Sequence, residues 1–246
     1  MPTIYLSPST QEFNEYANGL GTEEEWMNRL ADAMEPQLTA SGIRFTRNTP
    51  DMTAASSIRR ANSGSYDFYL ALHSNASADG SREGTVRGII AFYYPGSASG
   101  KRAAGIFVRN LKDIYPLPDK VYTSATTALG EVRQPYIPSV LLELGYHDNT
   151  ADALWVENNL EAIAANLVLS LTEYFGLPFV VPLTPWRGTV RTQGSPLHLR
   201  AAPALNSAVV TTMPSGAPVT VYGRYQDWYT VGYNGLLGYA FADYIT

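Results

Sequence analysis

The sequence predicts an α/β domain with a mostly parallel, twisted sheet and helices on both of its faces, followed by a small C-terminal β-barrel. Through residue 175, strand-like runs alternate with segments of helical spacing, which is typical of a parallel sheet. After Gly176, short β-type runs are separated by glycine, proline and asparagine turns. Apolar residues make up 45% of the 246 residues, which is enough for a packed core and argues against disorder.

The first part of the α/β segment contains two predicted strands and one helix. Residues 3–6 form a short apolar run, and residues 43–46 have the pattern of a second strand. Between them, residues 22–40 carry apolar side chains at three- and four-residue steps, which predicts an amphipathic helix. Thr22 is its expected N-cap, three glutamates follow in the first turn, where the helix dipole favours anions, and Gly42 ends it.

The second part contains the strands expected at the centre of the sheet. Residues 67–72 and 139–142 are near-continuous apolar runs, as expected for strands covered on both faces. Residues 86–94 predict a further strand, and helices are predicted over residues 99–115 and 152–175.

The pattern changes between residues 176 and 187, which indicates a domain boundary. We expect an α/β domain over residues 1–176, a proline-rich linker over residues 177–186 and a β module over residues 187–246. The module holds four arginines and two aspartates, for a net charge of +2, whereas the preceding residues carry −7. A weakly basic β module on an acidic α/β domain is typical of a binding appendage on an enzyme.

Composition excludes several function classes. The net charge of −5 argues against nucleic acid as the main partner, and no apolar run is long enough to cross a membrane. The chain has no cysteine, so disulfides, Cys-ligated zinc and thiol catalysis are excluded. The first seven residues show neither the basic nor the apolar region of a signal peptide. We expect a monomer with no nucleic-acid or membrane partner.

Polar side chains follow three of the predicted strands. Residues 7–11 follow the first, His73 follows the run at 67–72, and Glu143 follows the run at 139–142. Open α/β sheets bind ligands at the carboxyl ends of their strands, so these residues are the candidates for a functional site.

His73 and Glu143 each have a structural and a functional interpretation. His73 is either a buried histidine bonded to a backbone carbonyl or a zinc ligand, because imidazole binds zinc well. Glu143 is either paired with an arginine such as Arg133, or a general base whose pKa is tuned by a metal and an apolar wall. His198 lies between two leucines of the C-terminal module and is expected at the surface.

The three glutamates at 23–25 are most simply a solvated first turn of the helix. Glu24 lies three residues before Met27 and seven before Ala31, on the helix face that turns toward the sheet. We therefore expect Glu24 to be the one that faces inward.

Taken together, these residues resemble the zinc-dependent N-acetylmuramoyl-L-alanine amidases of bacterial cell-wall turnover and phage lysis. The resemblance spans roughly residues 3–175 and rests mainly on residues 72–76, residues 141–149, and Glu24 with Asn28 four residues later. It implies a bound Zn²⁺ with Glu24 and His73 among its ligands, and Glu143 as the general base.

One element of the family pattern is missing from this sequence. The family's first zinc ligand is a histidine in an Asp-Pro-Gly-His element after the first strand, and here residues 7–10 read Ser-Pro-Ser-Thr. Three explanations remain open: Gln11 or Thr10 faces the metal weakly, His147 supplies the imidazole, or the metal site is degraded. We favour His147 as the third metal ligand; the alternative is that it orients substrate or packs in its loop.

The resemblance also suggests substrate contacts in both parts of the chain. In the α/β domain, Asn75, Gln11 and Asn149 are the expected substrate-binding residues. The C-terminal residues resemble bacterial SH3-like cell-wall-binding modules, most specifically through the Leu-x-Leu-Arg-x-x-Pro pattern at residues 197–203. There we expect Tyr225 and Tyr233 to be exposed and to stack on peptide or sugar, and Trp228 to be a core residue.

The function implied by the resemblance is peptidoglycan hydrolysis. Zinc-activated water would cleave the amide that joins N-acetylmuramic acid to L-alanine of the stem peptide. Two alternatives remain: a non-catalytic peptidoglycan-binding protein on an amidase scaffold, and a zinc peptidase acting on stem peptides. The expected location is extracellular or in the cell wall, either as a secreted autolysin or as a released phage endolysin.

Overall fold

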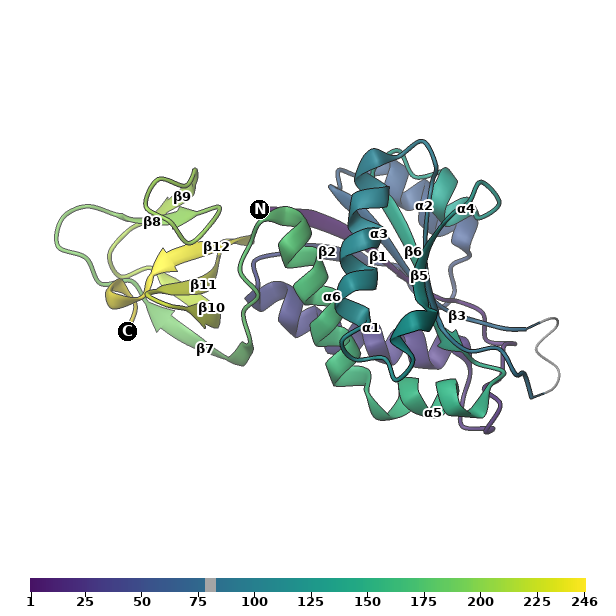
Figure 1. The fold of residues 1–246 in the computed structure, drawn as a ribbon. Coiled ribbons are helices and arrows are strands. Elements are labelled where there is room, and N and C mark those ends of the chain that lie inside the picture. The colour runs from purple at the N-terminus through teal and green to yellow at the C-terminus, as the bar shows by residue number, and fades with distance from the viewer. Residues whose placement is uncertain (78–82) are drawn as a thin grey trace. The chain divides into compact units, whose positions relative to one another are not determined.

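A computed structural model describes residues 1–77 and 83–246 (Figure 1). The chain forms two compact units. The larger comprises residues 3–34 and 45–174, and the smaller comprises residues 1–2, 35–44 and 175–246. No helix in the described part of the chain combines the length and apolarity needed to cross a bilayer.

The larger unit is built on a six-stranded sheet with the order β2-β1-β3-β6-β4-β5. The pairs β1–β3, β3–β6 and β4–β5 are parallel, and β4 is antiparallel to β6, so the sheet is mostly parallel as predicted. The strands are β1 (Thr3–Pro8), β2 (Arg44–Arg47), β3 (Phe68–Asn75), β4 (Ile89–Tyr93), β5 (Val121–Ala125) and β6 (Ser139–Tyr146).

Helices cover both faces of this sheet, as predicted (Figure 1). One face carries Tyr69, Ala71 and Leu141, which pack against apolar residues of α2 and α4. On the other face, the ring of Phe68 contacts rings of α3 and α6. The helices are α1 (Glu23–Ala40), α2 (Ala54–Ser63), α3 (Ala98–Leu111), η1 (Pro118–Lys120), α4 (Gly130–Arg133), α5 (Thr150–Asn158) and α6 (Leu160–Phe175).

The structure corrects the sequence-based elements at four places. Helices α2 and α4 and strand β5 lie in segments where no element was predicted. The single helix predicted over residues 152–175 is two helices, because Asn159 leaves helical geometry at φ −127° and ψ 19°. Its side chain donates to the carbonyl of Trp155, and its own carbonyl accepts from Ile163, so Asn159 both ends α5 and begins α6.

The C-terminal module is an antiparallel β structure, in agreement with the predicted barrel. Its strand order is β7-β10-β11-β12-β8-β9, around a core that includes Leu199, Val221 and Val231. A tight turn joins β11 to β12, where Asn234 and Gly235 both have positive φ. The elements are β7 (Pro182–Thr189), β8 (Leu197–Arg200), β9 (Val209–Met213), β10 (Pro218–Tyr225), β11 (Trp228–Tyr233), β12 (Leu236–Phe241) and η2 (Ala242–Tyr244).

Strand β7 begins inside the segment that was predicted to be a linker, and it pairs with β10 from Pro182 onward. The extended backbone expected there from the prolines is thus part of the module's sheet. The domain boundaries at residues 176 and 187 stay a prediction.

Candidate functional site

The site forms where β3 and β6 end, and it is centred on His73. Tyr69, Ala71 and His73 alternate along β3, so they share one face of the sheet. In the parallel pairing of these strands, His73 lies opposite Glu143. The two sequence-predicted residues are therefore neighbours on the same face.

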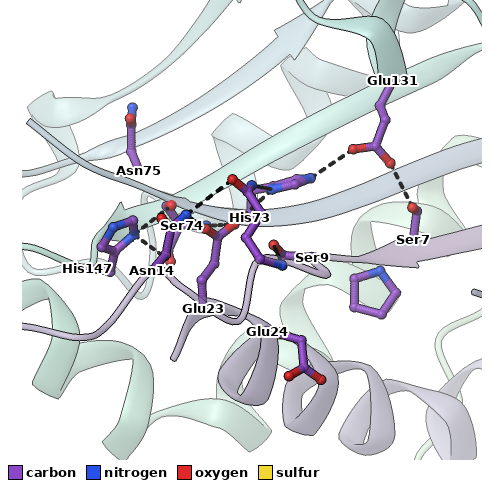
Figure 2. Close-up of polar contacts among 12 residues, drawn as sticks. Ser7, Ser9, Asn14, Glu23, Glu24, His73, Ser74, Asn75, Glu131 and His147 are labelled. Atoms are coloured by element: carbon purple, nitrogen blue, oxygen red, sulfur yellow. Dashed lines mark hydrogen bonds and ion pairs between the residues drawn. The ribbon is translucent and has the colours of Figure 1, made fainter. Parts of the chain in front are cut away.

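The imidazole of His73 lies between two buried carboxylates (Figure 2). Its Nδ1 is 2.8 Å from Oε1 of Glu23 at the start of α1, and its Nε2 is 2.9 Å from Oε2 of Glu131 in α4. Burial alone would lower the pKa of His73, but hydrogen bonds to the two glutamates and their charges raise it well above its ordinary value. The same contacts hold the carboxyl pKa of Glu23 and of Glu131 below the ordinary value, against the effect of burial.

Glu131 is anchored by two further hydrogen bonds from the sheet. Its Oε1 accepts from the hydroxyl of Ser7 at 2.7 Å and from the hydroxyl of Tyr69 at 2.6 Å. Ser7 comes from β1 and Tyr69 from β3, so three elements converge on one carboxylate. Glu131 was not predicted as a site residue, because it lies in a short helix that was itself not predicted. The sequence held one signal for such a residue. Ser7 and Tyr69 lie on two buried strands, and buried hydroxyl groups need hydrogen-bond partners.

Glu143 differs from the other two glutamates because one of its oxygens has no partner. The Oε2 atom is shielded from solvent and accepts no hydrogen bond in the described structure. Burial raises the pKa of Glu143 to about 7, the charge of His73 lowers it in part, and the charges of Glu23 and Glu131 raise it further. In the described residues, no ion pair joins Glu143 to Arg133, whose side chain is exposed.

The prediction that Glu24 faces inward is wrong, because Glu23 does. Glu23 is only 1% exposed, and it lies four residues before Met27 and seven before Leu30, on the fully buried stripe of α1. Its Oε2 accepts from the side-chain amide of Asn14 at 2.5 Å. Glu24 is half-buried, contacts Asn28 one turn along the helix, and points away from His73 (Figure 2).

His147 is buried, but the structure does not bring it to His73. Its Nδ1 lies 2.9 Å from the backbone carbonyl of Ser74, and its ring stacks on Tyr16 with a centroid distance of 6.0 Å. Figure 2 shows Ser74 between the two imidazoles. His147 therefore packs and orients its loop, in keeping with the alternative considered for it.

The three predicted substrate-binding residues of the α/β domain have different surroundings. Gln11 reaches the site, with Nε2 3.4 Å from Nδ1 of His73. Asn149 caps α5 by accepting from two backbone amides, and its amide donates to the carbonyl of Gly84, which is a structural role. Asn75 accepts from its own neighbour Ala76 and points away from His73 in Figure 2.

In the C-terminal module, Tyr225 and Tyr233 are half-buried rather than exposed, and Tyr233 packs against the core. Trp228 is buried and His198 is exposed, as predicted. A cavity of about 710 Å³ lies elsewhere in the module, and neither tyrosine lines it. Its lining includes Arg191, His198, Arg200, Trp228, Phe241 and Tyr244.

The donors that the structure assembles do not fit the zinc ion that the family resemblance implies. Both ring nitrogens of His73 have a carboxylate at hydrogen-bond distance, whereas a zinc ligand must offer a free lone pair. Residues 7–11 contain no histidine, and the side-chain amide nitrogen of Gln11 lies 3.4 Å from Nδ1 of His73. Within residues 1–77 and 83–246, no three His, Cys, Asp or Glu side chains are grouped around a point that would hold a metal ion.

A cavity of about 280 Å³ opens beside His73 and Glu131. Its lining includes polar residues from the end of β1 and the loop after it, Ser7, Ser9, Thr10 and Gln11. The cavity thus lies beside the imidazole and Glu131, and the third carboxylate, Glu143, lies opposite His73 on the neighbouring strand, with its pKa raised to about 7. Such an arrangement suits proton transfer in hydrolysis.

Comparisons with solved structures place the fold among cell-wall amidases. The CwlD amidase of Clostridioides difficile, solved in complex with the GerS lipoprotein, superposes with a TM-score of 0.62 at 15% identity, covering 72% of this chain and 99% of that chain. AmiC2 of Nostoc punctiforme gives 0.62 at 15% identity over 71% and 97% of the two chains. The catalytic domain of CwlV from Bacillus (Paenibacillus) polymyxa gives 0.62 at 15% identity over 72% and 100%.

At these identities the likeness shows the fold alone, and no curated protein matches the chain. The sequence itself matches two families. Residues 195–246 match the bacterial SH3 domain, and residues 10–173 match N-acetylmuramoyl-L-alanine amidase. The second match spans most of the chain and contains His73, Glu23, Glu131 and Glu143. The chain therefore belongs to the N-acetylmuramoyl-L-alanine amidase family and carries a bacterial SH3 domain at its C-terminal end.

Proposed function

We propose that this peptidoglycan amidase cleaves the amide bond between the lactyl group of N-acetylmuramic acid and L-alanine of the stem peptide, with Glu143 as the general base. One observation carries the proposal. Glu143 has an unpartnered buried oxygen and a pKa raised to about 7, so near neutral pH it exchanges protons readily. Its neighbours already have hydrogen-bond partners: His73 lies at hydrogen-bond distance from Glu23 through Nδ1 and from Glu131 through Nε2.

The proposed reaction uses Glu143 twice. Its carboxylate takes a proton from a water molecule that attacks the amide carbonyl, which gives a tetrahedral intermediate. The protonated Glu143 then gives that proton to the nitrogen of L-alanine as the carbon–nitrogen bond breaks. The products are a free lactyl carboxylate and a stem peptide with a free N-terminus.

Zinc activation of the water, which the family resemblance suggests, is not part of this proposal. The reason is the donor set around His73: carboxylates lie at hydrogen-bond distance from both ring nitrogens, and among the described residues no three His, Cys, Asp or Glu side chains are grouped to hold a metal ion. Peptidoglycan is the substrate class that the amidase and SH3 families support, and a wall-associated or extracellular location accords with it.

Mass spectrometry of digested peptidoglycan tests the proposed bond. The chain should release intact stem peptides that begin with L-alanine and should leave the glycan with free lactyl groups. The Glu143→Gln variant should release none, whereas Glu24→Gln should behave like the unsubstituted chain, because Glu24 points away from the site. Peptides cut internally would indicate a stem peptidase, and wall binding without any release would indicate a non-catalytic binding protein.

A further inference from the structure

The cavity of about 710 Å³ in the SH3 domain is lined by two arginines that the proposed amide cleavage does not use. In the part of the chain that the structure describes, neither Arg191 nor Arg200 forms an ion pair, although Asp243 belongs to the same lining. Arg191 is exposed, whereas Arg200 is half-buried. A cation that is partly shielded from water and has no anionic partner indicates a site that attracts an anion.

Strand β8 fixes the position of one of these cations. Leu197 and Leu199 belong to the core of the module, so the alternating residues His198 and Arg200 lie on the other face of the strand, where they line the cavity. Nη1 of Arg200 donates to the carbonyl of Ser207 at 2.8 Å, and Nη2 donates to Nδ1 of His198 at 3.0 Å. A guanidinium has five N–H groups, so three of them have no partner among the described residues. Because a guanidinium can only donate, Nδ1 of His198 accepts, and its Nε2 carries a proton that it can donate to a ligand.

Aromatic side chains form another part of the lining. The rings of Trp228 and Phe241 meet edge to face with centroids 5.5 Å apart, and the ring of Tyr244 lies 6.1 Å from that of Phe241. Such rings pack well on peptide groups and small apolar side chains. The volume lies within the range of roughly 300–1,000 Å³ that is typical of sites for organic ligands, and it exceeds what one small anion needs. The lining therefore suits an organic group that carries a negative charge.

We propose that this cavity binds the carboxyl-terminal end of a peptidoglycan stem peptide, with the terminal carboxylate held by Arg200 and Arg191. The planar fork of a guanidinium matches a carboxylate through two parallel hydrogen bonds. The last side chain of the peptide packs against Trp228 and Tyr244. Asp243 favours a peptide over a polyphosphate, because a peptide can present an amine to this carboxylate, whereas a row of phosphates is repelled by it.

This inference concerns a second site and goes beyond the proposed amide cleavage. That cleavage takes place at the amino end of the stem peptide and leaves its carboxyl end unchanged. The SH3 domain can therefore hold uncut wall and freed stem peptide alike, and freed peptide should compete with the wall for it.

Nuclear magnetic resonance of the full chain labelled with ¹⁵N-tryptophan tests the site, because the chain has only four tryptophans and Trp228 lines the cavity. A Trp228→Phe variant assigns the indole signal. A synthetic stem peptide that ends in D-alanine with a free carboxylate should move this signal in a saturable manner. The same peptide with a carboxamide end should bind at least tenfold more weakly, roughly the loss expected when a charge-assisted hydrogen bond is removed.

Three variants separate the role of the cavity from net charge and folding. Arg191→Ala should weaken binding of the free-acid peptide about threefold or more, and Arg200→Lys roughly tenfold, because lysine keeps the charge but lacks the planar fork. Arg187→Ala removes the same charge from an exposed position of the module that does not line the cavity, so it should change the affinity by less than about twofold. The indole signal of Trp186, which packs against the core of the module, reports whether each variant is folded.

The inference would be overturned by a carboxamide peptide that binds as well as the free acid, or by a Trp228 signal that the stem peptide does not move. Equal losses in Arg191→Ala and Arg187→Ala would overturn it as well, and so would a glycerol phosphate polymer that binds more tightly than the peptide. The proposed amide cleavage is tested separately. A chain that binds the peptide but releases none from peptidoglycan would refute only the cleavage, and a chain that releases peptides without binding them at Trp228 would refute only this inference.

Discussion

Glu143→Gln should make the α/β domain more stable at alkaline pH while abolishing hydrolysis. The pKa of Glu143 is raised from 4.5 to about 7 in the folded chain, mainly by burial. Between these values the folded chain binds more protons than the unfolded chain, so rising pH lowers the free energy of unfolding. Above about pH 7 the folded chain bears the full cost of burying an ionised Glu143. The difference between the two pKa values corresponds to a loss of about 3 kcal/mol in the free energy of unfolding.

Glutamine keeps the size of the side chain but has no charge to bury, so the variant should escape this penalty. At pH 8.5 its α/β domain should unfold at a higher temperature, by roughly 2–4 °C per kcal/mol for a domain of this size. The gain should shrink as pH falls through 7 and should vanish below about pH 4.5, where Glu143 is protonated in both states. Scanning calorimetry of both chains across this pH range measures the effect.

Glu24→Gln is the matched control, because Glu24 is half-buried and its carboxylate accepts a hydrogen bond from Asn28 on its own helix. Its effect on stability should stay within about 0.5 kcal/mol at every pH. A Glu143 that is destabilising when ionised is contradicted if Glu143→Gln is less stable than the unsubstituted chain at pH 8.5, or if its effect is the same at pH 4 and pH 8.5.

Three further predictions concern the pH profile of the reaction, the two glutamates at the start of α1, and the SH3 domain. The kcat/KM for stem-peptide release should rise about tenfold per pH unit below pH 7 and level off above it, because Glu143 must be ionised to accept a proton; a flat rate from pH 5 to 8 would contradict this. Glu23→Gln should lower kcat at least tenfold and Glu24→Gln by less than twofold in wall-digestion assays, since only Glu23 contacts the imidazole. Arg191→Ala, at the cavity of the SH3 domain, should weaken sedimentation with purified walls, whereas Tyr225→Ala should not, because Tyr225 does not line that cavity; equal losses would place wall binding elsewhere.

The sequence predicted the sheet and the strand-end site because both follow from short-range patterns. Buried runs at residues 67–72 and 139–142 marked two adjacent central strands, and the polar residues directly after them had to lie at one sheet edge. His73 and Glu143 were found in this way. The antiparallel β4 could not be distinguished from a parallel strand, because a strand buried on both faces reads the same in either direction.

The choice between Glu23 and Glu24 depended on helix phase at the first residue of α1. Glu24 matches Met27 and Ala31 in spacing, but Glu23 matches Met27 and Leu30 equally well, and both sets are fully buried. Periodicity alone does not separate two positions that differ by 100° at a helix end. The bond from Asn14, in the loop before α1, helps fix Glu23 in place, and that contact has no sequence signature.

Glu131 could not be predicted from the sequence for a different reason. It belongs to a four-residue helix whose position depends on packing of Val132 beneath it, not on any amphipathic pattern. Its partners Ser7, Tyr69 and His73 lie 58 to 124 residues away in sequence. Long-range polar networks of this kind are fixed by the tertiary fold, and only the buried hydroxyls hinted that an acceptor was needed.

Chemical rescue of Glu143→Ala tests the central role of that carboxylate most directly. The alanine variant should digest purified peptidoglycan very slowly, and formate should restore release of stem peptides in proportion to its concentration, whereas chloride at equal ionic strength should not. An alanine variant that digests walls at the rate of the unsubstituted chain, without any formate, would contradict the account.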